Sequence, residues 1–132
     1  MKCSDFTILV AEDDLSTLKI YEQALSAEGY RLILVESYER ALAELYEKEA
    51  NLLITDLKMA DMHGFEMFPL LMKNHPNLPV IVVSGTYQGL MEDFHNKGFG
   101  NVKAFFLKPM NMSVLKRSIR EVLKIEDLST AE

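Results

Sequence analysis

The clearest strand in the sequence is PVIVVS, at residues 79–84. Its apolar residues follow one another without polar alternation, which is typical of a strand buried on both faces of a parallel sheet. Four other short runs have the same character: FTILVA at residues 6–11, RLILV at 31–35, NLLIT at 51–55 and AFFL at 104–107. The sequence therefore predicts five strands in a parallel sheet.

Helical patterns separate these strands. Residues 15–28 place Leu18, Tyr21 and Leu25 at helical spacing, and Gly29 follows as a stop signal. Four other helices are expected. The second begins after the N-cap residue Ser37, and the third ends near His75 and Pro76. The fourth runs over residues 87–97, and the fifth begins after the N-cap residue Asn111. Five strands alternating with five helices predict an α/β fold, a doubly wound (βα)5 sheet covered on both faces.

The length and composition limit the possible functions. The 132 residues fit one domain, which we assign to residues 1–125, followed by a polar tail or the start of a linker at residues 126–132. The one cysteine, Cys3, excludes an internal disulfide and a cysteine-based zinc site. A net charge of −6 argues against direct binding of nucleic acid. Without a membrane-length apolar run or a signal peptide, we expect a cytoplasmic protein.

Polar side chains stand at the carboxyl ends of four of the five expected strands. They are Glu12, Asp13 and Asp14 after the first strand, Asp56 after the third, Ser84 at the end of the fourth and Lys108 after the fifth. Ligands of open α/β sheets bind outside the carboxyl ends of the strands, where the strand order reverses. The sequence therefore predicts a functional site at this edge of the sheet.

The expected site has the groups that phosphoryl transfer to a carboxylate needs. Clustered carboxylates repel one another unless a cation lies between them, and a few oxygen ligands with room for water suit Mg²⁺. Lys108 supplies a fixed positive charge, and Ser84 supplies a hydroxyl donor for a phosphoryl oxygen. Asp56 is then the expected nucleophile.

Each of these residues also has a structural interpretation. Asp13 or Asp14 alone is more often a helix N-cap. Ser84 and Asp56 alone fit turn residues, and Lys108 before a proline fits the end of a strand. Their joint occurrence after the four appropriate strands favours the functional interpretation.

Four segments of the chain resemble the receiver domain of bacterial response regulators. They are ILVAEDD at residues 8–14, ITDLKMADMHG at 54–64, SG at 84–85 and FFLKP at 105–109. The resemblance extends over residues 6–124. It implies a flavodoxin-like fold of the chemotaxis-regulator type with the strand order 2-1-3-4-5.

The resemblance implies a role for each matching residue. Asp56 is the implied phosphoacceptor, and Ser84 and Lys108 contact the phosphoryl group. Phe105 occupies the aromatic switch position, whose rotamer follows the movement of Ser84. The bond between Lys108 and Pro109 is expected to be cis.

The resemblance also implies a set of Mg²⁺ ligands. Asp13 and Asp56 bind the metal directly through their carboxylates, and the backbone carbonyl of Lys58 completes the protein ligands. Glu12 contributes through a water molecule.

Some residues depart from the family pattern. Ala60 replaces the usual proline, which predicts a less rigid loop after the phosphoacceptor. Gly85 replaces the commoner alanine, and Phe105 lacks the hydroxyl of the usual tyrosine. Lys58 and Thr86 occupy the two positions that tune the lifetime of the phosphoryl group.

The resemblance implies a phosphorylation-dependent signalling switch. A sensor histidine kinase or a phosphotransfer protein donates the phosphoryl group to Asp56, Ser84 and Phe105 rearrange, and a downstream effector protein or domain reads the changed face. Such a domain catalyses only its own phosphorylation and dephosphorylation. A homodimer is a further possibility. The ends at Met1 and Glu132 fit a stand-alone regulator or, slightly better, a domain of a longer regulator or hybrid kinase.

Other functions remain open at this stage. A Mg²⁺-dependent aspartyl-phosphate phosphatase needs an Asp-x-Asp motif after the first strand, which Asp13-Asp14-Leu15 does not supply. A protein-interaction domain of the same fold that is never phosphorylated is the other alternative, and failure to bind Mg²⁺ would favour it. Flavin binding is disfavoured because the Ser/Thr/Gly-rich phosphate loop is missing after the first strand.

Overall fold

The computed structural model describes residues 2–85 and 91–125. The helix expected over residues 87–97 is therefore described only from Met91 onward. The expectations for Thr86 and for the tail at residues 126–132 lie outside the described residues. Within the described ranges, no helix is both long and apolar enough to span a membrane.

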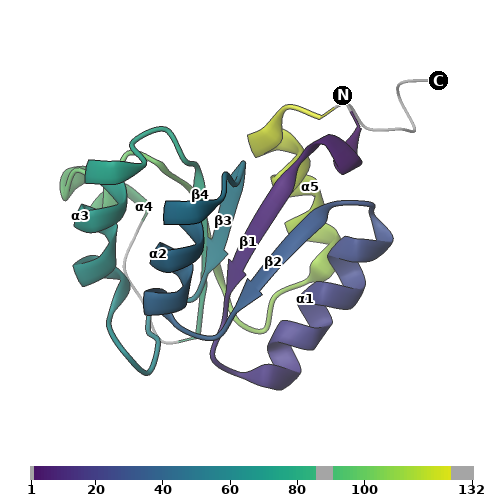
Figure 1. The fold of residues 1–132 in the computed structure, drawn as a ribbon, viewed down its shortest axis with the longest axis horizontal. Helices are drawn as coiled ribbons and strands as arrows, with labels where there is room; N and C mark the ends of the chain where they lie inside the picture. Colours follow the sequence, from purple (N-terminus) through teal and green to yellow (C-terminus); the bar gives the residue numbers. More distant parts are fainter. Residues whose placement is uncertain (1, 86–90, 126–132) are drawn as a thin grey trace.

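Five strands form one parallel sheet in the order β2-β1-β3-β4-β5 (Figure 1). They are β1 (Thr7–Ala11), β2 (Arg31–Val35), β3 (Leu52–Thr55), β4 (Val80–Ser84) and β5 (Val102–Leu107). Every neighbouring pair runs parallel, so all five carboxyl ends lie at one edge of the sheet. The expected fold class and strand order are confirmed.

Helices cover both faces of the sheet (Figure 1). They are α1 (Leu15–Ala27), α2 (Tyr38–Glu47), α3 (Gly64–Asn74), α4 (Met91–Asn96) and α5 (Met112–Leu123), and a short 3-10 turn, Cys3–Asp5, precedes β1. Helices α2, α3 and α4 pack on one face, and helices α1 and α5 pack on the other.

Two hydrophobic cores therefore lie on either side of the strands. In β1, Leu9 belongs to the core under α2, α3 and α4, whereas Ile8 and Val10 belong to the core under α1 and α5. All three side chains are fully buried. Because both faces are covered, the interior positions of the central strands are apolar on both sides of the sheet, which explains their continuous apolar runs.

The predicted helix caps are confirmed. The Ser37 hydroxyl accepts a hydrogen bond from the backbone N–H of Arg40 at 3.1 Å. The Asn111 side chain accepts from the backbone N–H of Ser113 at 2.8 Å. Gly29, after α1, has φ of +100°, a conformation that side chains with a Cβ rarely adopt.

One strand boundary differs from the prediction by more than one residue. The strand expected at residues 104–107 begins two residues earlier, at Val102, which pairs with Val80. The register shifts between Val80 and Ile81, and the exposed Lys103 interrupts the apolar run at this point. The apolar pattern therefore did not predict the start of β5, because a polar residue lies at an irregular part of this edge strand.

The loop between β3 and α3 packs tightly against the start of α2. A Cβ atom at Gly64 would lie 2.9 Å from Leu57 Cδ1, 3.1 Å from the Leu57 carbonyl oxygen and 3.2 Å from the Tyr38 hydroxyl. The backbone N–H of Gly64 also donates to the Leu57 carbonyl at 2.6 Å. Residue 64 must therefore lack a side chain for the loop to close in this way.

We expect Gly64→Ala to lower the free energy of unfolding by about 1–3 kcal/mol, because the added methyl group overpacks a closed site that includes backbone atoms. Urea unfolding followed by circular dichroism measures the change. Gly100→Ala is the matched control, since a Cβ there meets no atom within 4 Å, and it should stay within about 0.5 kcal/mol of the wild type. Equal stabilities for the two variants would contradict the tight packing of the loop.

Candidate functional site at the carboxyl edge of the sheet

The predicted site residues lie at the carboxyl ends of β1, β3, β4 and β5. Glu12 and Asp13 follow β1, and Asp56 follows β3, its immediate neighbour in the sheet. Ser84 is the last residue of β4, and Lys108 follows β5 directly. The parallel arrangement thus brings residues that are far apart in the sequence to one edge of the sheet.

The Lys108 ammonium group joins the two acids that follow the central strands. Its Nζ atom lies 2.7 Å from Glu12 Oε1 and 2.7 Å from Asp56 Oδ2. The backbone N–H of Lys108 donates to the Ser84 carbonyl at 3.0 Å, which fixes the start of this side chain beside β4. Glu12 is almost fully buried, at 1% exposure.

Burial and ion pairing oppose each other in this cluster. Burial raises the pKa of Glu12 above its ordinary value, although hydrogen bonds and the charge of Lys108 partly offset this. For Lys108, burial favours the neutral amine, but hydrogen bonds to Asp56 and Glu12 outweigh it, so its pKa lies above the ordinary lysine value. Burial, with the nearby charge of Glu12, also raises the pKa of Tyr21 to about 12.

The two aspartates after β1 have different contacts. Asp14 is the N-cap of α1, because its carboxylate accepts from the Ser16 N–H at 3.2 Å and from the Thr17 hydroxyl at 2.7 Å. The Asp13 carboxylate instead accepts from the backbone N–H of Ala60 at 3.1 Å. The N-cap interpretation thus holds for Asp14, and Asp13 points towards the loop after β3.

The remaining predicted residues lie in the loop after Asp56 and in or directly after β4 and β5. The Oδ1 atom of Asp56 faces the backbone N–H of Lys58 at 3.4 Å. Ser84 is fully buried. Phe105 is half-buried in β5, and its ring centroid lies 5.7 Å from that of Phe94 in α4. The peptide bond between Lys108 and Pro109 is cis, as expected.

Two residues near Asp56 were missed by the sequence analysis. The Tyr38 hydroxyl donates a hydrogen bond to the backbone carbonyl of Asp56. The Asp61 carboxylate accepts from the backbone N–H groups of Tyr38 and Glu39. No local pattern indicates either contact, because the partners lie 18 to 23 positions apart in the sequence. Tyr38 has the sequence context of an ordinary first residue of a helix.

The acidic residues fit a metal that uses few protein ligands. Among the described residues, no group of three or more His, Cys, Asp or Glu side chains is arranged to hold a metal ion. Mg²⁺ usually keeps several waters and binds through only one or two carboxylates. The carboxylates of Asp13 and Asp56 and the backbone carbonyl of Lys58 would be hard oxygen donors of the kind that Mg²⁺ uses. Glu12, Asp13 and Asp56 together also carry more negative charge than Lys108 neutralises.

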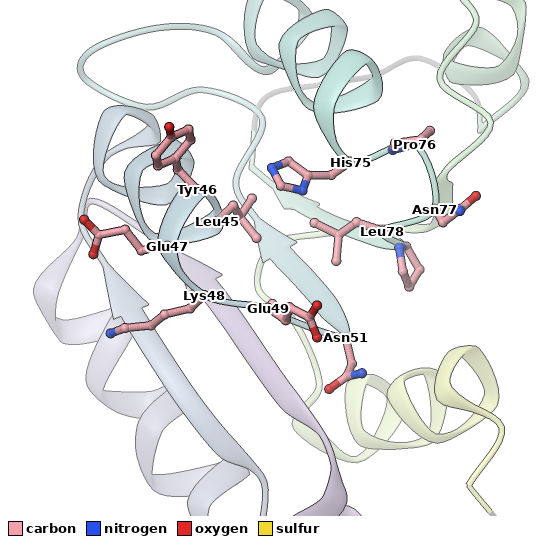
Figure 2. A pocket seen from close by; sticks show the side chains of 12 residues that line it. Leu45, Tyr46, Glu47, Lys48, Glu49, Asn51, His75, Pro76, Asn77 and Leu78 are labelled. Atoms are coloured by element: carbon pink, nitrogen blue, oxygen red, sulfur yellow. The ribbon is translucent and has the colours of Figure 1, made fainter.

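A large open pocket lies at the opposite end of the strands. It has a volume of about 700 Å³ and lies between the segments that lead into β3 and β4 (Figure 2). Leu45, Tyr46 and Glu47 line it from the end of α2, and His75 and Pro76 line it after α3. The pocket therefore contains none of the residues gathered at the carboxyl edge.

Comparisons with known proteins identify a family and a fold for this chain. Residues 8–120 match the family model described as response regulator receiver domain. The transcriptional regulatory protein GlrR of Escherichia coli (strain K12) is 30% identical over 125 residues, which cover 95% of this chain and 28% of GlrR. The DNA-binding transcriptional regulator NtrC of Bradyrhizobium sp. (strain RP501 Parasponia) is 40% identical over 78 residues, or 59% of this chain and 16% of NtrC.

A solved structure shows the same similarity. The crystal structure of a response regulator receiver domain protein (CheY-like) from Methanospirillum hungatei JF-1 superposes with a TM-score of 0.80 at 30% identity. The match covers 90% of this chain and 94% of that chain. The present chain thus matches nearly a whole receiver domain, but it spans less than a third of the length of the first curated relative.

We expect Lys108→Met to lower the free energy of unfolding at pH 7 by about 1–3 kcal/mol, because buried Glu12 loses its cationic partner. Without Lys108 the pKa of Glu12 rises further above its ordinary value, so the deficit should shrink as the pH falls from 7 towards the pKa of Glu12 in the wild type, since a protonated carboxyl needs no cation. Urea unfolding at a series of pH values measures both effects. Lys73→Met, at an exposed position of α3, is the control. A deficit that does not change with pH would contradict this account.

Proposed function

The chain belongs to the response regulator receiver domain family, and from this membership we propose that it is a phosphorylation-dependent switch with Asp56 as the phosphoacceptor. The observation that carries the proposal is the contact of 2.7 Å between the Asp56 carboxylate and Lys108 Nζ, at the carboxyl edge of the sheet. The contact supports the proposal because it sets the Asp56 carboxylate, the proposed nucleophile, beside a fixed positive charge at the edge where ligands of such sheets bind.

The proposed reaction is a transfer from a partner's phosphohistidine. An oxygen of the Asp56 carboxylate attacks the phosphorus atom, and the bond from phosphorus to the imidazole nitrogen breaks as the new bond forms. The nitrogen keeps the electron pair of the broken bond. Lys108 and the Ser84 hydroxyl stabilise the charge on the phosphoryl oxygens. Hydrolysis of the acyl phosphate later restores the free carboxylate.

The proposal includes one Mg²⁺ ion. Asp13, Asp56 and the backbone carbonyl of Lys58 would hold it directly, and Glu12 would act through water. When bound, the metal supplies positive charge to the phosphoryl oxygens during transfer. Independently of the metal, the contacts of Lys108 at 2.7 Å hold Glu12 and the reacting Asp56 in position.

The proposed switch passes through β4 and β5 to α4. Ser84, at the end of β4, moves towards the new phosphoryl group, and Phe105 on the adjacent strand fills the vacated space. The contact between the rings of Phe105 and Phe94 links this movement to α4. A difference of a few kcal/mol between the two states is enough to invert their populations.

The partners follow from the proposed chemistry. A sensor histidine kinase or a phosphotransfer protein supplies the phosphoryl group, and an effector protein or domain reads the altered face. The relatives GlrR and NtrC are named as transcriptional regulators, so a transcriptional output is a fitting proposal for a longer protein that contains this chain. Given the net charge of −6, another domain would contact the DNA. A homodimer of the receiver domain is compatible with this output.

We expect the wild-type protein to gain the mass of one phosphoryl group when it is incubated with acetyl phosphate and Mg²⁺. Asp56→Asn should gain none, because an amide is not a nucleophile for this transfer. EDTA should also abolish the gain. Intact-mass spectrometry measures all three results.

Asp14→Asn is the matched control for this experiment. Asn caps a helix about as well as Asp, and Asp14 serves as the cap of α1. The variant should therefore be phosphorylated like the wild type. If the wild type gains no mass and Mg²⁺ leaves the protein unperturbed, the switch is refuted and an interaction-only domain is favoured.

A further inference from the structure

Helix α2 begins directly beside the backbone of Asp56. Tyr38, its first residue, is fully buried, and its hydroxyl donates to the Asp56 backbone carbonyl. The Thr55 hydroxyl donates to the same oxygen at 2.9 Å. A carbonyl oxygen has two lone pairs, so both are used, and the peptide plane after Asp56 is held from two sides.

A second contact joins the same loop to the same helix. The Asp61 carboxylate accepts from the backbone N–H of Tyr38 at 3.2 Å and of Glu39 at 2.9 Å. These N–H groups lie in the first turn of α2, where backbone donors lack partners within the helix and a negative charge is favoured. The loop is thus attached to α2 at both Asp56 and Asp61.

The Tyr38 hydroxyl is not needed to fill the core. The ring belongs to the core under α2, α3 and α4, and a phenylalanine ring would occupy the same space. The hydroxyl lies close to the backbone of Gly64, where an added Cβ atom would be 3.2 Å from it. Burial raises the pKa of Tyr38, a hydrogen bond with the Thr55 side chain partly offsets this, and the nearby charges of Asp56 and Asp61 add to it. The hydroxyl therefore keeps its proton and acts as a donor.

We propose that Tyr38 is a positioning residue for phosphorylation, because its hydroxyl fixes the backbone carbonyl of Asp56 and so the direction of the Asp56 carboxylate. Asp61 supports it by fixing the first turn of α2. This inference rests on Asp56 being the phosphoacceptor. A carboxylate that attacks phosphorus in line must be held closely, and small misplacements of reacting groups are costly in rate.

The test is Tyr38→Phe, which removes the hydroxyl and keeps the ring. We expect the maximal rate of phosphorylation by acetyl phosphate to fall about tenfold, as for the loss of one well-placed contact. The donor concentration that gives half the maximal rate should change less than about twofold, because Tyr38 does not contact the donor. The Tm should fall by only about 4 °C, so the assay is run well below the unfolding transition.

Tyr46→Phe is the matched control, since Tyr46 lies on the same helix but is 88% exposed. It should be phosphorylated at the wild-type rate. Asp61→Ala should slow phosphorylation in the same direction as Tyr38→Phe. In NMR spectra, the ¹³C resonance of the Asp56 carbonyl should shift in Tyr38→Phe and stay unchanged in Tyr46→Phe.

The outcomes separate the two proposals. If the wild type and Tyr46→Phe take up no phosphoryl group, the function of Asp56 is refuted and the inference with it. If the wild type is phosphorylated and Tyr38→Phe reaches the same maximal rate, the function stands and the positioning role of Tyr38 is refuted. A higher half-saturating concentration with an unchanged maximal rate would also refute the positioning role.

Discussion

The ammonium group of Lys108 is the interaction on which the carboxyl edge of the sheet depends. It contacts both Glu12, after β1, and Asp56, after β3, at 2.7 Å, although it follows the edge strand β5. Glu12 is almost completely buried, and an ionised carboxylate in such a place is costly without a paired cation. The contact with Lys108 stabilises the buried Glu12 carboxylate, and together with the Asp56 contact it joins the ends of β1, β3 and β5.

The parallel sheet explains why most of this site was predictable from the sequence. Strands buried on both faces give continuous apolar runs, so the ends of β1, β3 and β4 could be located within one residue. The residue that follows each run, such as Asp56 after β3, must then lie at the common carboxyl edge. The caps at Ser37 and Asn111 were also predictable, because capping depends on residues only two or three positions away.

Contacts between distant parts of the chain were not predictable in this way. Tyr38 meets the Asp56 carbonyl across 18 positions, and Asp61 meets the Tyr38 N–H across 23. Nothing in the local sequence distinguishes this tyrosine from any apolar residue of a helix. The start of β5 at Val102 was missed for a related reason, since its pairing with Val80 comes before a register shift. Tertiary packing decides both features.

The loop after β3 shows how one substitution can alter a site without changing the fold. Ala60, in place of the usual proline, predicts a less rigid loop. The backbone N–H of Ala60 donates to Asp13 Oδ2 at 3.1 Å, and a proline has no N–H to donate. Alanine therefore adds a tie between this loop and the β1–α1 loop, and it occupies one oxygen of a proposed metal ligand. The loop is held at three points: at Asp13 through Ala60, at α2 through Asp61, and at Tyr38 through Asp56. These contacts join the loop to two neighbouring elements, whereas a proline ring would restrict the backbone only locally.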